Sequence, residues 1–155
     1  MIKHSLLLFL ALTSIFISAA SSCNKEDDNP NMENNTPMTN GKIKIKVGSQ
    51  TFTATLLINN SAKAFLEMLP LTFNMVELNN KEKYYDLSSS LPTQSSNPGT
   101  ITNGDLMLYG SKTLVLFYKT FSTSYSYTKL GAVDDVTGWA SALGSSNVIV
   151  TFERE

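Results

Sequence analysis

The sequence predicts a mainly β fold, a closed antiparallel barrel of about eight strands with two short helices. Apolar and polar residues alternate over several strand-length runs, and small turn residues separate these runs at short intervals. Helical spacing occurs in only two short segments. Closing the sheet into a barrel would leave no strand edge exposed to another chain.

Hairpin turns connect several of the predicted strands. Gly48-Ser49, Asn79–Glu82 and Gly110-Ser111 are turn sequences between neighbouring runs. Ser88–Asn103 is a long loop of Ser, Asn, Pro and Gly, and loops of that length are usually functional or mobile. In chain order the predicted strands are Lys42–Val47, Gln50–Leu57, Leu71–Leu78, Lys83–Leu87, Leu106–Tyr109, Thr113–Tyr118, Thr123–Leu130 and Val148–Phe152.

The two predicted helices each have a capping residue and a stop signal. The Asn59-Asn60 pair can cap the first helix, and Pro70 ends it because proline cannot continue a helix. The Asp134-Asp135 pair can cap the second helix, and Gly144 ends it. Their apolar residues are Ala62, Phe65, Leu66 and Leu69 in the first helix, and Val136, Trp139, Ala140 and Leu143 in the second.

Residues 1–22 have the layout of a lipoprotein signal peptide. A basic start precedes an apolar run from Leu6 to Ile17, and small residues then lead to Cys23, the only cysteine. The run is shorter than the ~20 residues that a spanning helix needs. We expect Cys23 to be lipidated and to anchor the protein to a membrane. The alternative is a secretory signal cut after Ala20, which would leave a free thiol.

The residues around Cys23 indicate a location. Ala20-Ser21-Ser22-Cys23 resembles a bacterial lipobox, in the loosened form of the Bacteroidota. Cys23–Asp28 resembles the lysine-plus-acidic tag that directs lipoproteins of these bacteria to the outer face of the outer membrane. The resemblance implies a cell-envelope protein that is lipid-anchored to the outer membrane and surface-exposed. The alternative for the acidic stretch is a solvated charge run at the start of a linker.

The rest of the chain divides into a tether and one domain. Residues 23–41 comprise Cys23 and an acidic, polar segment, which has too little apolar surface to offset the entropy cost of ordering and is predicted to be a disordered tether. Residues 42–155 are the size of one compact domain. Nine lysines and Arg154 there nearly balance nine carboxylates, with no basic cluster, so we expect no nucleic-acid partner.

Five segments are spread over nearly all of residues 42–155, namely Ile43–Leu56, Ala62–Phe73, Tyr84-Tyr85-Asp86-Leu87, Gly104–Gly110 and Thr113–Gly131. These segments resemble the small bacterial cyclophilin-like domain family. The resemblance implies a cyclophilin-like closed antiparallel β-barrel of eight strands capped by two helices. The family is largely uncharacterised, and its members occur alone, behind lipoprotein leaders or beside flavodoxin-type domains.

The residues argue against the prolyl isomerase activity that the family name suggests. Cyclophilins use a barrel arginine, surrounded by Phe, Gln, Trp and His, to hydrogen-bond the twisting peptide. Arg154 is the only arginine here, one residue from the end, and His4, the only histidine, leaves with the signal peptide. Lysine lacks the planar fork that fixes donor geometry. We therefore predict no catalytic residues, and with no His or free Cys, no metal site and no cofactor.

A Tyr-rich stretch is the best candidate for ligand binding. Tyr125 and Tyr127 share one face of the predicted strand Thr123–Leu130, and tyrosines of neighbouring strands, including Tyr84, can join them. The predicted groove lies on the barrel flank, walled by these rings and by Ser88–Asn103. The alternative is an ordinary β surface with half of its rings in the core. The candidate residues are Tyr85, Tyr109, Tyr118, Phe121, Ser124, Tyr125 and Tyr127.

Two functions from different classes follow. The first is an envelope lipoprotein with a non-catalytic binding or accessory domain that recognises a peptide, glycan or small molecule. The second is an enzyme, either a degenerate peptidyl-prolyl isomerase or a domain that acts with a flavodoxin-type partner. The composition of the predicted mature chain favours the first, because so few side chains suited to catalysis remain.

Overall fold

The computed structural model describes residues 39–155. The predicted signal peptide, Cys23 and the tether up to residue 38 lie outside the described residues. Strand β1 begins at Thr39. Residues 39–41, which were predicted to belong to the tether, extend the pairing of β1 with β2.

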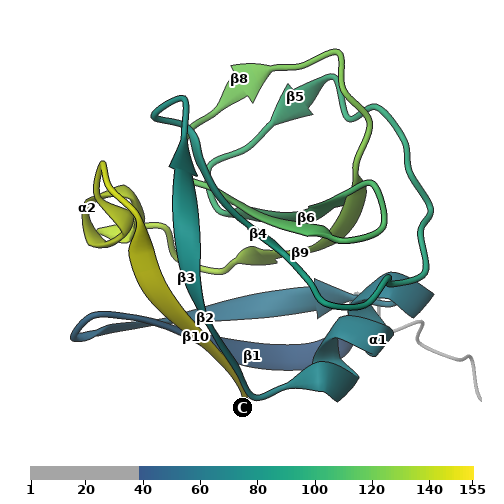
Figure 1. Cartoon of the computed structure of the whole chain (residues 1–155), viewed down its shortest axis with the longest axis horizontal. Coiled ribbons are helices and arrows are strands. Elements are labelled where there is room, and N and C mark those ends of the chain that lie inside the picture. The colour runs from purple at the N-terminus through teal and green to yellow at the C-terminus, as the bar shows by residue number, and fades with distance from the viewer. Residues whose placement is uncertain (1–38) are drawn as a thin grey trace, which may run out of the picture. The chain divides into compact units, whose positions relative to one another are not determined.

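The chain order of the elements is mainly β with two short helices (Figure 1). The bounds are β1 (Thr39–Val47), β2 (Gln50–Leu57), α1 (Asn60–Met68), β3 (Leu71–Leu78), β4 (Glu82–Asp86), β5 (Thr100–Ile101), β6 (Asp105–Tyr109), β7 (Thr113–Phe117), β8 (Phe121–Ser122), β9 (Thr128–Val133), α2 (Trp139–Leu143) and β10 (Val148–Arg154).

Eight of these strands close into an antiparallel barrel, in the order β1-β10-β3-β4-β7-β6-β9-β2. The remaining two, β5 and β8, pair with each other as a separate two-stranded sheet outside the barrel (Figure 1). The predicted fold class, a closed eight-stranded antiparallel barrel with two short helices, is confirmed. Strands β5 and β8 were not predicted from the sequence.

The barrel interior is filled by alternate residues of each strand, as the strand period requires. In β1, Ile43, Ile45 and Val47 are buried and the intervening lysines face outward. The two helices contribute aromatic side chains to the same core. Phe65 of α1 packs edge-to-face against Phe152 at 5.6 Å between ring centroids. Trp139 of α2 packs against Phe52 at 4.9 Å and donates its indole N–H to the Phe117 carbonyl.

The helix starts agree with the prediction in one case and differ in the other. Asn59 caps α1, because its side-chain oxygen accepts from the Ala62 N–H at 2.7 Å. The predicted capping of α2 by the Asp134-Asp135 pair is wrong. Gly138 precedes α2 with φ of 77°, in the left-handed region, and gives no side-chain cap. The Asp135 carboxylate instead accepts from Thr137 N–H, which makes a turn before the helix.

Strand β9 begins five residues later than the predicted strand Thr123–Leu130. It pairs with β2 through Gly131, where a Cβ atom would lie 2.3 Å from the Thr55 carbonyl oxygen. This close approach of the two backbones needs glycine at position 131. Residues 123–126 belong to no strand.

Candidate ligand-binding groove

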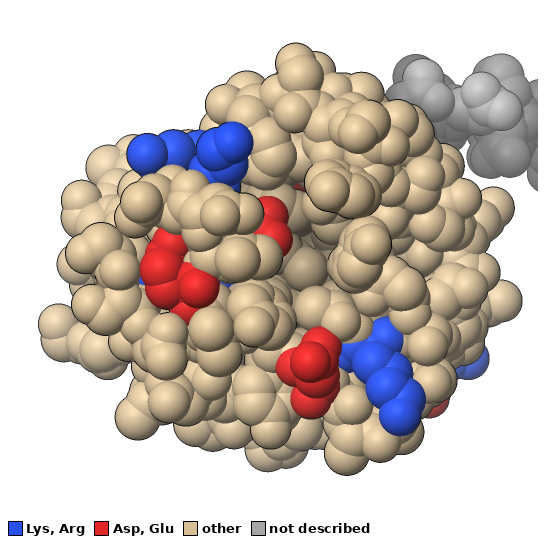
Figure 2. Space-filling model, turned by 45° about the horizontal axis from the view of Figure 1, so that its top comes forward, with Lys and Arg blue, Asp and Glu red and all other residues tan. Residues whose placement is uncertain are grey.

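A groove with a volume of about 590 Å³ lies on the outer wall of the barrel. We call it the tyrosine groove, because aromatic rings, hydroxyl groups and two carboxylates form its lining. In Figure 2 the molecule is hollowed near the middle of the face shown, with acidic side chains on either side of the hollow. The lining residues are Leu78, Asn79, Lys81, Glu82, Tyr84, Asp86, Tyr109, Thr113, Val115, Phe121, Ser122, Thr123, Ser124, Tyr125 and Tyr127.

Strand β4 forms one side of the groove. Because side chains alternate along a strand, Glu82, Tyr84 and Asp86 all point to the outer face, where they line the groove. The residues between them point into the barrel. Lys83 there is completely buried, and Tyr85 packs against the main core.

A small second hydrophobic cluster forms the floor of the groove, outside the barrel. Phe117 packs edge-to-face against Tyr127, with ring centroids 5.5 Å apart, and against Phe121 at 5.8 Å. Such aromatic pairs fix ring orientation beyond what burial alone achieves. The buried members of this cluster are Ile101, Met107, Val115, Phe117 and Tyr127, and Tyr84 and Phe121 pack against it.

Two tyrosines leave much of their rings open to solvent. Tyr109 is 47% exposed and Tyr125 is 61% exposed. Their rings meet edge-to-face, with centroids 6.2 Å apart. Tyr127 lies behind Tyr109 at 5.6 Å and is only 7% exposed, and burial raises the pKa of its phenol. The groove therefore has accessible aromatic rings at its opening, which we call the mouth, and buried aromatic rings at its floor.

The Ser88–Asn103 loop does not wall the groove as predicted. It supports the Phe121–Tyr127 segment through backbone contacts instead. Ser96 and Tyr127 exchange two hydrogen bonds of 3.0 Å, and the Thr123 N–H donates to the Gly99 carbonyl at 2.9 Å. The Asn97 side chain donates to the Ser124 carbonyl at 3.2 Å. These bonds satisfy the backbone of a segment that leaves the barrel, so the groove-lining side chains are held in place.

Three charged side chains line the groove. The Lys81 ammonium lies over the Phe121 ring, 4.7 Å from its centroid. Asp86 accepts a hydrogen bond of 2.6 Å from the Thr113 hydroxyl. Burial, and then the nearby charge of Glu77, raise the pKa of Glu82, while the charge of Lys81 acts in the opposite direction.

Five of the seven candidate residues line the tyrosine groove, namely Tyr109, Phe121, Ser124, Tyr125 and Tyr127. The other two do not. Tyr85 stacks on Phe73 inside the barrel, with ring centroids 4.0 Å apart. Tyr118 is buried, and its hydroxyl donates to Glu77. Strand alternation explains both positions. Tyr85 points inward from β4, and Tyr118, the residue that follows β7, points inward as well, so both pack with the main core.

The candidate residues predicted from the sequence include none of the three charged residues that line the groove, Lys81, Glu82 and Asp86. Glu82 and Asp86 flank Tyr84 at alternate positions of one short strand, which is a signal visible in the sequence. In an alternating strand Tyr85 lies on the same face as Leu87, an apolar residue that is buried. The same alternation could have placed Glu82, Tyr84 and Asp86 on the opposite, outer face. Lys81 lies in a turn, where alternation gives no information.

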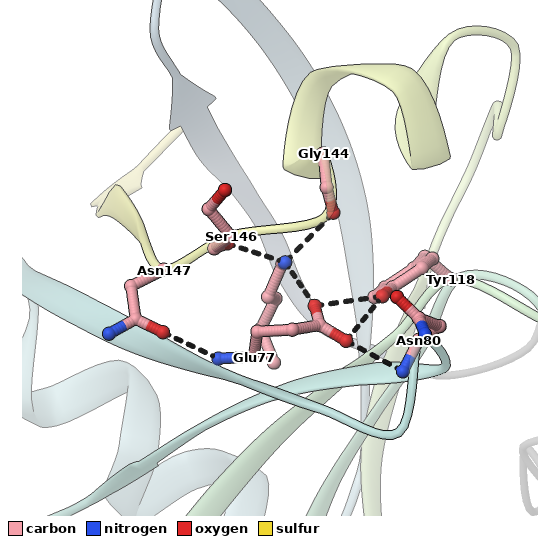
Figure 3. A network of polar contacts seen from close by, with 7 residues as sticks. Glu77, Asn80, Tyr118, Gly144, Ser146 and Asn147 are labelled. Carbon is pink, nitrogen blue, oxygen red and sulfur yellow. Dashed lines mark hydrogen bonds and ion pairs between the residues drawn. The ribbon is translucent and has the colours of Figure 1, made fainter.

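A second polar arrangement lies at the inward side of β4 (Figure 3). The buried Lys83 ammonium forms an ion pair with Glu77 and donates to the carbonyls of Gly144 and Ser146 at 2.8 and 2.7 Å. The Tyr118 hydroxyl lies 2.8 Å from Glu77. All three N–H groups of the ammonium thus have acceptors. This network ties the segment after α2 to β3 and β4, which is a structural role.

Two other kinds of functional feature are absent from the described part of the chain. Residues 39–155 contain no group of three or more His, Cys, Asp or Glu side chains placed to hold a metal ion. No helix among them is long and apolar enough to cross a membrane. Arg154 lies outside the groove, where its Nε donates to the Leu66 carbonyl of α1 at 3.1 Å.

Comparison with known proteins supports the fold assignment. The structure is similar to the solution structure of a hypothetical protein from Archaeoglobus fulgidus, with a TM-score of 0.51 and 15% identity. The similarity covers 74% of this chain and 95% of that chain, and at this identity it concerns the fold alone. Among curated proteins no similar sequence was found. The model of the Cyclophilin-like family matches residues 45–153, and the chain therefore belongs to the Cyclophilin-like family.

Proposed function

We propose that this protein is an envelope lipoprotein whose cyclophilin-like domain is a non-catalytic binding module. The tyrosine groove is its ligand site. The observation that carries this proposal is the groove, which combines a volume of about 590 Å³ with the exposed rings of Tyr109 and Tyr125. A concave site with a mainly apolar floor and a few polar groups is typical of small-molecule or side-chain recognition.

The composition of the groove supports binding over reaction. A cyclophilin-type isomerase needs an arginine over the substrate peptide, and Arg154 is engaged with α1 instead. The groove offers rings for stacking, and hydroxyl groups of Thr113, Thr123 and Ser124 for hydrogen bonds. Tyrosine supplies large contact area with few rotatable bonds, so little entropy is lost when a ligand binds.

Binding is tested with the purified full-length protein by calorimetry. The probes are acetylated tetrapeptides, chito-oligosaccharides and small amines. We expect at least one probe to bind, and the Tyr109→Ala, Tyr125→Ala double variant to weaken that binding at least about tenfold. Ile149→Ala is the matched control, because Ile149 is 63% exposed and does not line the groove. Binding by no probe, or equal binding by the double variant, would contradict the proposal.

The envelope location rests on the leader and on Cys23. Two or three acyl chains would anchor the domain far more firmly than one, at ~0.8 kcal/mol per buried methylene. Cells that express the protein should incorporate labelled palmitate into it, and Cys23→Ser should abolish the label. Protease added to intact cells should remove the domain if it faces outward. Protection of the domain in intact cells, with digestion after lysis, would contradict surface exposure.

A further inference from the structure

The charges of the tyrosine groove are not balanced within the groove. Two carboxylates, Glu82 and Asp86, line it together with one ammonium, that of Lys81. Neither carboxylate forms an ion pair with a described residue, although four ion pairs occur elsewhere in residues 39–155. Glu82 is half-buried, and no hydrogen bond from a described residue to its carboxylate contributes to its electrostatics. The groove therefore carries a net negative charge next to aromatic rings.

Aromatic faces are the second feature. The face of a ring carries negative electrostatic potential, and a cation above it is stabilised. The protein already contains this interaction in the groove, because the Lys81 ammonium lies 4.7 Å from the Phe121 centroid. The exposed rings of Tyr109 and Tyr125 have no such cation among the described residues.

The two carboxylates lie toward opposite ends of the groove. Glu82 and Asp86 lie four positions apart along β4, which corresponds to about 13 Å. Lys81 and Phe121 lie near Glu82, since the charge of Lys81 acts on Glu82. At the other end, Asp86 pairs across the sheet with Thr113, and Thr113 pairs with Tyr109. Cross-strand partners share a face, so this end combines a carboxylate with an exposed ring.

We propose that the tyrosine groove binds an organic cation, an ammonium or quaternary ammonium group on a short apolar stem. The cation lies at the end formed by Asp86, Tyr109 and Tyr125. This inference rests on the proposed function of the groove and adds the chemical class of its ligand. The stem lies along the aromatic floor towards Phe121, and Glu82 adds long-range attraction.

The test compares two probes that differ only in charge. Choline and 3,3-dimethyl-1-butanol have the same shape, but the second has a neutral carbon in place of the cationic nitrogen. Both are titrated into the full-length protein and followed by amide NMR shifts. We expect choline to bind at least about tenfold more tightly than its neutral analogue. We also expect salt to weaken choline binding and to leave the analogue unaffected.

Variants separate the roles of charge and ring. Asp86→Asn should weaken choline binding about fivefold or more, and Tyr125→Leu should weaken it by a similar factor while the apolar contact is kept. The analogue should bind both variants as it binds the wild type. Glu67→Gln is the control, because Glu67 is an exposed carboxylate of α1 outside the groove. Asp86→Asn keeps a side-chain oxygen that can accept from the Thr113 hydroxyl, so it removes the charge and leaves this hydrogen bond possible. If Asp86→Asn nevertheless does not fold, Tyr125→Leu decides the matter.

Equal binding of choline and its analogue would overturn the cation inference and leave the binding function intact. The same holds if neither binds but a peptide or oligosaccharide from the earlier panel does. If no probe of either set binds, the proposed function itself fails. Choline binding that persists unchanged in both Asp86→Asn and Tyr125→Leu would also overturn the inference, because the cation would then lie elsewhere.

Discussion

Lys83 and Glu77 form an ion pair inside the barrel, and the lysine side chain has no exposed surface. Buried charges are tolerated only when they are fully paired, and this pair is completed by two carbonyls and the Tyr118 hydroxyl. The ion pair lies on the inward face of β4, whereas the tyrosine groove lies on the outward face. The same short strand therefore supplies both a structural network and a candidate binding surface.

Removal of Lys83 should destabilise the protein strongly. Lys83→Met leaves the Glu77 carboxylate and two carbonyls without their partner, and we expect a loss of about 3–5 kcal/mol in the free energy of unfolding. Chemical denaturation at pH 7 measures it. Lys63→Met is the control, since Lys63 is exposed on α1, and it should change stability by less than about 0.5 kcal/mol. A Lys83→Met variant as stable as the control would show that the network does not hold the fold.

Acid should weaken the network. Burial alone would raise the pKa of Glu77, but hydrogen bonds from Lys83 and Tyr118 outweigh this effect and lower its pKa below the ordinary 4.5. Because the folded-state pKa is lowered, the stabilisation is present above the ordinary value and is lost as pH falls below it. Denaturation at stepwise lower pH should show this loss as a slope of the free energy of unfolding against pH, and Glu77→Gln should make that slope smaller. Asp134 and Asp135 also have lowered pKa values, so part of the slope should remain. An unchanged slope in Glu77→Gln would contradict this assignment.

Glu82 should show the opposite behaviour. Burial raises the pKa of Glu82, so the folded state disfavours the charged form. Its contribution to stability is present below the ordinary pKa and is lost as pH rises through the raised value. Glu82→Gln should therefore be more stable than the wild type at pH 7, by up to about 1 kcal/mol, and not at pH 3. Lower stability of Glu82→Gln at pH 7 would mean that the carboxylate has a favourable partner.

The two tyrosines of the Tyr-rich stretch should differ in their effect on stability. Tyr127 is 7% exposed and belongs to the second hydrophobic cluster. Tyr127→Ala should therefore lower the free energy of unfolding by about 3–5 kcal/mol. Tyr125 is 61% exposed, and Tyr125→Ala should change stability by less than about 0.5 kcal/mol. Thermal or chemical denaturation of both variants checks this. Similar losses for the two variants would contradict the division into floor and mouth.

Gly131 should tolerate no side chain. A Cβ atom there would lie 2.3 Å from the Thr55 carbonyl oxygen and 3.0 Å from the Leu56 Cα, and both are backbone atoms that cannot move aside cheaply. Gly131→Ala should therefore lower the free energy of unfolding by about 1–3 kcal/mol, because the added methyl group forces β2 and β9 apart. The neighbouring Ala132→Gly is a useful comparison, because it opens space without a clash. A stable Gly131→Ala variant would show that β2 and β9 can separate freely.

The barrel strands were largely predictable, because alternation and turn residues are local signals. Strands β2 and β3 have the predicted bounds. Strands β5 and β8 have two residues each, which is too short to show an alternation of apolar and polar residues. They pair with each other only because the chain between them folds back. The role of Asp134 was likewise not predictable, because its carboxylate accepts hydrogen bonds from Lys42 and Thr55, which lie far away in the sequence. Such contacts leave no local pattern.

The composition of the candidate site was predictable from the sequence, but residue type alone left open which residues of β4 face outward. The rings of Tyr109, Phe121, Tyr125 and Tyr127 share the groove, as a Tyr-rich surface suggested. Tyrosine occurs at two adjacent positions of β4, so residue type alone could not show which one faces outward. The inward face was fixed by the burial of Lys83, a charged residue that ordinarily marks an exposed face. The network around Glu77 reverses that expectation.

The most direct test of the central claim is a map of amide chemical shifts in the full-length protein during titration with a probe that binds. If the tyrosine groove is the ligand site, the shifted amides should belong to residues 81–86, 109–115 and 121–127, and Tyr109→Ala combined with Tyr125→Ala should abolish them. Shifts confined to the α2 segment or to α1 would show that the ligand binds elsewhere on the barrel.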